Sequence, residues 1–139
     1  MGESLTMNDL MLYSFIGLVI LYILYSKGII LADFNFATPK EAMDIMKNEK
    51  NNMIILDVRT DAEYHTAGHI KGAILIPVGE LKARLDELKE FKERKIIVYC
   101  ASGNRSISAS RILYGHGFNP YNLNGGINNW KRNDYKIAN

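Results

Sequence analysis

The sequence contains little cysteine, tryptophan or proline: one Cys, one Trp and three Pro occur in 139 residues. A single thiol cannot form a disulfide within the chain, and it cannot build a thiolate metal site alone. The three histidines, His65, His69 and His116, do not have the spacing of a zinc motif. We therefore expect neither a metal ion nor a cofactor.

An excess of charge of one sign is also lacking. The formal net charge is +2, and Lys and Arg do not gather into a cluster with interleaved aromatic residues. Such clusters mark surfaces that bind nucleic acid, so nucleic acid is not an expected partner. Hydrophobic residues make up 47% and charged residues 23% of the chain, a composition typical of a folded protein.

One stretch has no charge at all: LMLYSFIGLVILYILYS, residues 10–26. As a helix it would extend roughly 25 Å, slightly less than the ~30 Å hydrocarbon core of a bilayer. The apolar segment GIILA resumes after Lys27 and ends at Ala32, and a lysine near a helix end can reach the interface. We predict that residues 1–32 form a single-pass membrane anchor, with residues 10–32 in contact with the membrane.

Two other interpretations of this stretch are less consistent with its sequence. A cleaved signal peptide normally begins with Lys or Arg, whereas the first nine residues contain Glu3 and Asp9 instead. A buried core helix normally has a polar face, and none is visible here. Lys and Arg concentrate on the cytoplasmic side of a span. Because Lys27 and Lys40 follow the stretch and neither residue type precedes it, we expect the rest of the chain in the cytoplasm.

Residues 33–139 are enough for one small domain, and apolar runs of strand length alternate there with helical patterns. Thr38, Pro39 and Glu41 form a typical helix start. This alternation predicts an α/β fold with a mainly parallel sheet. The expected strands lie at 33–36, 53–58, 73–77, 95–100 and near 121–123, and the expected helices at 38–50, 79–91, 106 to Gly115 or Gly117, and a last piece ending near 130.

The only cysteine stands at the end of a predicted strand, in the segment CASGNRS, residues 100–106. A helix that begins just after this loop would aim backbone N–H groups and the positive end of its dipole at the sulfur. Arg105 adds a permanent positive charge, and Gly103 lets the loop curl. A buried structural cysteine is the alternative, but such a position does not need a polar turn. The segment therefore indicates a stabilised thiolate nucleophile.

Three motifs together resemble the single-domain rhodanese, or sulfurtransferase, family. They are CASGNRS, ILDVRTDAEYHTAGHIKGAILIP at 55–77 and NLNGGINNW at 122–130, and the similarity covers essentially all of 33–139. The resemblance implies a rhodanese-like fold, a central parallel sheet of about five strands flanked by helices, here preceded by one transmembrane helix. It also implies that Cys100 is the catalytic nucleophile and carries a persulfide.

The length of the loop bears on which anion it holds. Only Ala101, Ser102, Gly103 and Asn104 separate Cys100 from Arg105, whereas the related tyrosine-phosphatase signature has five intervening residues. A smaller ring of N–H groups suits one extra sulfur atom better than a phosphoryl group. These five residues after the cysteine are the expected binding and thiolate-stabilising residues. The expected partners are a small anionic donor such as thiosulfate and a thiol, protein or cyanide acceptor.

Two further functions remain open at this stage: a small phosphatase or arsenate reductase of related fold, and a non-enzymatic interaction module. Asp57 and Arg59 are candidate supporting residues, either holding the loop or forming an ordinary ion pair at a strand end. The family resemblance makes them mostly architectural. His69 is expected to be a hydrogen-bonded structural residue, and Gly125 and Gly126 are expected to be turn glycines.

Overall fold

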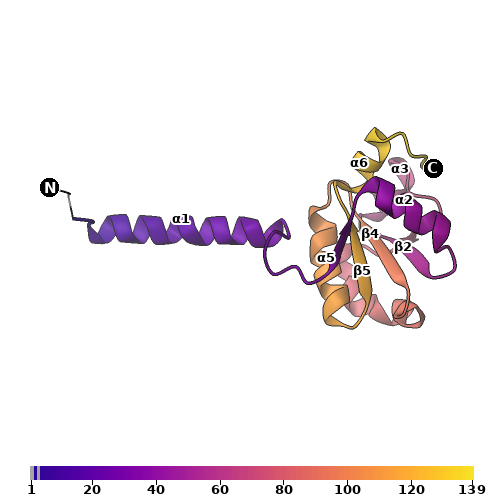
Figure 1. The fold of residues 1–139 in the computed structure, drawn as a ribbon, viewed down its shortest axis with the longest axis horizontal. Helices are drawn as coiled ribbons and strands as arrows, with labels where there is room; N and C mark the ends of the chain where they lie inside the picture. Colours follow the sequence, from indigo (N-terminus) through magenta and orange to yellow (C-terminus); the bar gives the residue numbers. More distant parts are fainter. Residues whose placement is uncertain (1, 3) are drawn as a thin grey trace. The chain divides into compact units, whose positions relative to one another are not determined.

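The computed structural model describes residues 2 and 4–139 of the chain, which divides into two compact units. The first is Met1–Ala32 and the second is Asp33–Asn139. Figure 1 shows the long helix α1 of the first unit and the layered α/β arrangement of the second.

The first unit consists of helix α1, Met7–Ser26, and a turn that follows it. Thr6 caps the helix through a reciprocal capping box with Asp9. Its 20 residues extend about 30 Å, the thickness of a bilayer core, and none of them is buried. The apolar segment 28–32 was expected to continue the helix, but it does not. Gly28 (φ 69°) and Leu31 (φ 54°) turn the backbone out of helical geometry.

The second unit is built on one sheet in which, among the described residues, five strands run parallel in the order β1-β5-β4-β2-β3. This arrangement confirms the predicted α/β class and the parallel sheet. The strands are β1 Asn35–Ala37, β2 Met53–Asp57, β3 Ile74–Leu75, β4 Lys95–Tyr99 and β5 Asn119–Leu123.

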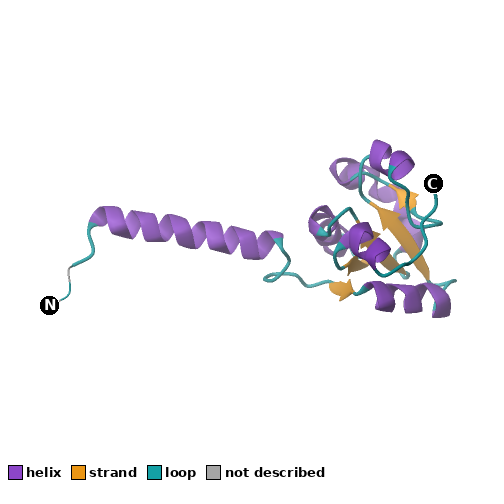
Figure 2. Ribbon diagram, turned by 90° about the horizontal axis from the view of Figure 1, so that it is seen from above, coloured by secondary structure: helices purple, strands orange, loops and turns teal. Residues whose placement is uncertain are grey.

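Helices cover both faces of this sheet, as Figure 2 shows. They are α2 Pro39–Asn48, α3 Asp61–Thr66, α4 Val78–Leu81, the 3₁₀ helix η1 Lys82–Phe91, α5 Asn104–Gly115 and α6 Gly126–Arg132. Side chains alternate along a strand, so Ile97 and Tyr99 of β4 pack with α2, α3 and α6, while Ile96 and Val98 pack with α4, η1 and α5. The sheet is therefore buried on both sides, which explains the continuous apolar runs in its central strands.

Two predicted elements differ from the structure in detail. The first strand lies at Asn35–Ala37 rather than 33–36, because it pairs with Tyr121 to Leu123 of β5. The helix expected over 79–91 is a short α-helix followed by the 3₁₀ helix η1, with a kink at Arg84 (φ −114°). Leu81 and Leu88 are both fully buried in the core, and a 3₁₀ helix rises about 2.0 Å per residue, so this segment spans more of the sheet than an α-helix would.

Two other helices match their prediction at one end. Helix α2 has Thr38 as its N-cap, Pro39 in its first turn and Glu41 completing the capping box. Helix α5 ends at Gly115, one of the two predicted ends, but it begins at Asn104 rather than 106. Arg105 is therefore part of a helix and not of the preceding loop.

Candidate active site

Cys100 follows directly after β4 and lies on the same side of the sheet as Ile96 and Val98. Its side chain is buried, with 1% of the residue exposed. In a parallel sheet, sites form beyond the carboxyl ends of the strands, and Cys100 occupies such a position between β4 and α5.

The sulfur of Cys100 acts as the acceptor at the amino end of α5. The backbone N–H of Gly103 donates to Sγ over 3.1 Å, and that of Ser106 donates over 3.4 Å. Gly103, the N-cap residue, has a left-handed backbone (φ 104°) and supplies no side chain of its own. The sulfur thus accepts from a helix N–H that a capping Ser or Asp would otherwise satisfy, and the helix dipole favours negative charge there.

Ser106 belongs to this group, and the sequence analysis did not identify it. Its hydroxyl lies 3.4 Å from Cys100 Sγ, as an acceptor for the thiol, and donates to the Gly103 carbonyl over 3.0 Å. Loss of the thiol proton leaves the two N–H donors in place, so ionisation costs the sulfur no donor. The signal for Ser106 was its position three residues after a glycine that starts a helix.

Helix α6 holds the loop from the other side. The N–H groups of Ile127 and Asn128 donate to the carbonyl oxygens of Cys100 and Ala101 over 2.9 and 3.0 Å. Because a trans peptide places its N–H opposite its C=O, the N–H groups of Ala101 and Ser102 point away from α6. The close approach requires Gly126 (φ 60°), since a Cβ there would collide with the same two carbonyl oxygens.

Arg105, in the first turn of α5, binds Glu63 of α3 through both ends of its guanidinium. Nη1 contacts Oε2 and Nη2 contacts Oε1, each over 2.8 Å. This bidentate pair is about two-thirds buried, with 39% of the Arg105 and 33% of the Glu63 side chain exposed. The predicted cation beside Cys100 is therefore paired with a carboxylate, which changes the net charge of the site.

Glu63 is held in place by its own helix. Its Oε2 accepts from the backbone N–H of Thr60 over 2.9 Å and from the Thr60 hydroxyl over 3.0 Å, which makes a capping box for α3. Glu63 was not among the predicted site residues. The spacing Thr60-x-x-Glu63 is the signal that locates it at a helix start, although its arginine partner lies 42 residues away.

The pKa values of Glu63 and Arg105 are both shifted in the direction that favours the charged form. The Arg105 guanidinium, with help from Thr60, lowers the pKa of Glu63 from 4.5 to about 2. Hydrogen bonding by Glu63 raises the pKa of Arg105, and the Cys100 thiolate adds a smaller effect in the same direction. Glu63 is thus ionised at any pH above about 2, and the pair persists over the range in which enzymes are assayed.

Comparison with known proteins decides the family. A model of the rhodanese-like domain matches residues 38–133. The chain belongs to the rhodanese family.

Individual relatives agree with this assignment. A protein named sulfurtransferase from Allochromatium vinosum is 33% identical over 91 residues, which cover 65% of this chain and 82% of the relative. The tRNA uridine(34) hydroxylase of Hamiltonella defensa is 41% identical over 91 residues, 58% of this chain, but the match spans a quarter (25%) of that protein. The crystal structure of a rhodanese-related protein from Thermoplasma volcanium, 30% identical, superposes with a TM-score of 0.68 and covers 76% of this chain and 98% of that one.

The other predicted residues of the rhodanese loop have different positions. Ser102 and Asn104 are exposed at its rim, Ala101 is half-buried and Gly103 is buried. Of the loop, the buried backbone at Gly103 is what donates to the sulfur.

Asp57 and Arg59 form a buried ion pair, 0% and 2% exposed, on the opposite side of the sheet from Cys100. The Arg59 Nη2 donates to Asp57 Oδ2 and to the Gly68 carbonyl, each over 2.7 Å. The hydroxyl of Tyr99 accepts from the N–H of Ile70 in the same turn. The Asp57 carboxylate accepts from the backbone and the guanidinium of Arg59, and Arg59 reaches this turn, so Asp57 holds Arg59 rather than the 101–104 loop.

His69 lies in that same turn, stacked on the Tyr64 ring with 3.8 Å between centroids. Its backbone forms a bridge with Ala138 near the end of the chain. These contacts agree with the structural role expected for His69.

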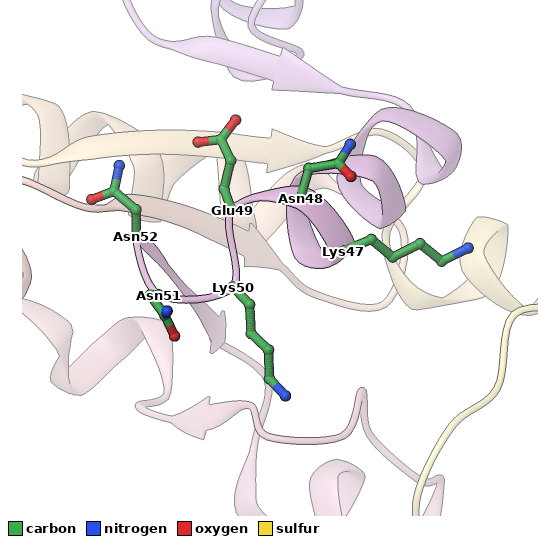
Figure 3. Close-up of a pocket in the computed structure, with 6 residues that line it drawn as sticks. All are labelled: Lys47, Asn48, Glu49, Lys50, Asn51 and Asn52. Carbon is green, nitrogen blue, oxygen red and sulfur yellow. The ribbon is translucent and has the colours of Figure 1, made fainter.

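A separate pocket lies between α2 and β2, and it is lined by Lys47, Asn48, Glu49, Lys50, Asn51 and Asn52 (Figure 3). It precedes the first residue of β2, so it is at the amino ends of the parallel strands, whereas Cys100 is beyond a carboxyl end. Its lining has no cysteine or histidine, and we assign it no part in the chemistry.

The support of the loop by α6 can be tested with Gly126→Ala. We expect a loss of unfolding free energy of about 2 kcal/mol or more, because the methyl group collides with the loop carbonyls at a left-handed position. Trp130 of α6 is the only tryptophan in the chain and is buried, so its fluorescence during urea unfolding reports the change. Gly79→Ala, at a helical glycine with open space, is the matched control and should be neutral or slightly stabilising. Equal stability of the two variants would contradict this account.

The role of Arg105 can be tested with Arg105→Ala. The pH profile for alkylation of Cys100 by iodoacetamide should move to higher pH, because the thiolate loses the guanidinium and faces the Glu63 carboxylate alone. The double variant Arg105→Ala/Glu63→Gln removes both charges and should recover most of the shift. Superimposable pH profiles of the wild type and Arg105→Ala would show that Arg105 does not act on the sulfur.

Proposed function

We propose that this rhodanese is a membrane-anchored sulfurtransferase that moves sulfane sulfur through a persulfide on Cys100. The observation that carries the proposal is the sulfur itself, buried and accepting two backbone N–H groups at the start of α5. Such donors stabilise the thiolate, which is the nucleophilic form of cysteine. The sulfurtransferase from Allochromatium vinosum, matched over most of its length, supports the same chemistry.

In the first step the Cys100 thiolate attacks the outer sulfur of an anionic donor such as thiosulfate. A bond forms between the two sulfur atoms, and the bond from the outer sulfur to the rest of the donor breaks. The bonding pair leaves with sulfite, so thiolate and thiosulfate become persulfide anion and sulfite without an added proton or electron. The N–H groups of Gly103 and Ser106, with those of Ala101 and Ser102, stabilise the persulfide, and Arg105 binds the anionic end of the donor.

In the second step an acceptor nucleophile removes the outer sulfur and regenerates the thiolate. Cyanide serves in an assay and yields thiocyanate, and a small thiol or a protein serves in the cell. The chain has one cysteine, so it cannot resolve its own persulfide as an internal disulfide. The acceptor therefore comes from outside, and the two half-reactions predict ping-pong kinetics.

Residues 1–32 act in this proposal as the anchor of the rhodanese domain at 33–139. Helix α1 is long and apolar enough to cross a bilayer, and its large side chains, among them Leu12, Phe15 and Tyr22, are exposed. With Lys27 and Lys40 on the domain side, the domain is in the cytoplasm, where thiols are kept reduced and acceptors are abundant.

Mass spectrometry tests the persulfide directly. Thiosulfate should add about 32 Da, one sulfur atom, to the full chain in a non-ionic detergent, and cyanide should remove it. Cys100→Ser should show no gain and should lose sulfur transfer to cyanide by a factor of about a thousand or more. Ser108→Ala, exposed on α5, is the control and should behave as the wild type. A wild-type protein that gains no mass would refute the proposal.

Orientation is tested with two reporter cysteines in a Cys100→Ser background, since the native thiol is buried. Ser4→Cys and Lys89→Cys are exposed and lie on the two sides of α1 in sequence. A membrane-impermeant maleimide applied to intact cells should label Ser4→Cys at once and Lys89→Cys after lysis. The reverse pattern would place the domain outside the cytoplasm, and labelling of both before lysis would contradict the single span.

A further inference from the structure

The pair Glu63–Arg105 is more than a surface salt bridge. Lys40–Asp44, by comparison, joins two side chains that are 80% and 51% exposed, on neighbouring turns of one helix. Glu63 and Arg105 come from different helices, are partly buried, and meet through two parallel hydrogen bonds of 2.8 Å. Such bidentate pairs are geometrically specific and stronger than single contacts.

The geometry leaves Glu63 little freedom to move aside. Its carboxylate accepts from the Thr60 backbone, the Thr60 hydroxyl and both ends of the guanidinium. The capping box fixes it to the first turn of α3 whether or not Arg105 is bound. A donor that binds Arg105 therefore meets a carboxylate that stays in place.

The charges at the site can then be counted. The Cys100 thiolate carries one negative charge, Arg105 one positive charge and Glu63 one negative charge. The sum is −1, whereas the thiolate and Arg105 alone would sum to zero. The persulfide carries the same charge as the thiolate, so this surplus remains through both half-reactions.

From this arrangement we infer that Glu63 is a specificity-determining residue, which makes the site select monoanionic sulfane donors, such as persulfides and thiosulfonates, over dianionic ones. The inference rests on the proposed sulfur transfer and concerns the charge of its donor. Both donor classes share Arg105 and the loop N–H groups, but the second negative charge of thiosulfate is opposed by the fixed carboxylate. Thiosulfonate supplies the same outer sulfur and leaves as a sulfinate, so the step balances in the same way.

The test compares thiosulfate with methanethiosulfonate, which differ by one charge, using the full chain in non-ionic detergent at low ionic strength. Glu63→Gln removes the charge, yet Gln still serves at this position of a capping box. The ratio of kcat/KM for thiosulfate to that for methanethiosulfonate should rise at least tenfold, which is the effect of one unit charge about 12 Å away at an effective dielectric constant of about 20 and is exceeded at shorter distances.

The chain supplies a matched control. Glu41 completes the same kind of capping box with Thr38 at the start of α2, with the backbone of Thr38 donating to it over 2.8 Å. Glu41→Gln loses the same charge at the same helical position and should leave the donor ratio unchanged. An equal rise in both variants would show a general effect of net charge and overturn the inference.

A second readout does not depend on sulfur transfer. Alkylation of Cys100 by the anion iodoacetate, relative to neutral iodoacetamide, should also accelerate in Glu63→Gln. If Glu63→Gln does not fold, the wild type decides: its donor ratio should rise with added salt, because screening weakens the repulsion. A flat or falling ratio would overturn the inference.

The two proposals fail in different ways. If neither donor adds sulfur to Cys100 in the wild type, the proposed function is refuted and the donor selection with it. If both donors load Cys100 and the ratio is the same in the wild type and a folded Glu63→Gln, sulfur transfer stands. Glu63 then holds Arg105 in position and does not select the donor.

Discussion

Two backbone N–H groups, those of Gly103 and Ser106, converge on the sulfur of Cys100 and fix where α5 begins. The two donors favour negative charge on the sulfur, and the helix needs an acceptor because Gly103 has no side chain. One constraint therefore serves the stability of the helix and the reactivity of the thiol together. Strand β4 leads into the loop that carries the sulfur, and α6 forms hydrogen bonds to that loop. Both elements therefore help to meet the same requirement.

Charge around this sulfur is arranged by helix starts. The described chain has capping boxes at Thr6–Asp9, Thr38–Glu41 and Thr60–Glu63, and the same local geometry fixes each carboxylate. In α1 and α2 the carboxylate of the capping box serves the start of its own helix. In α3 the carboxylate also binds Arg105, so the capping box of one helix becomes part of the electrostatics at the start of another, α5.

Much of the fold was predictable because its signals are local. The apolar runs located β2 and β4, and the Thr38 box located α2, since each depends on residues within one turn or strand. The strand-end cysteine, the polar glycine turn and the resemblance to rhodaneses together singled out Cys100, its loop and Arg105 as the candidate site, and their chemical roles stay predictions. By contrast, the predicted ends of β1 were wrong because its pairing with β5 decides them. The predicted α-helix at η1 was wrong because the burial of Leu81 and Leu88 decides the geometry of that segment. The contacts of Glu63 with α5 and of Gly126 with the loop were not foreseen, because they join segments that only the folded sheet brings together.

The hydrogen bonds from Ile127 and Asn128 to the loop carbonyls have a consequence for the order of synthesis. A ribosome makes the chain from its amino end, so the thiol of Cys100 is complete before the helix that supports it has been made. At ordinary elongation rates the delay is about one to five seconds. During that interval the nascent thiol lacks the buried setting that the folded domain gives it. Completion of the candidate site therefore depends on residues that are made after Cys100, whereas helix α1 is made before it.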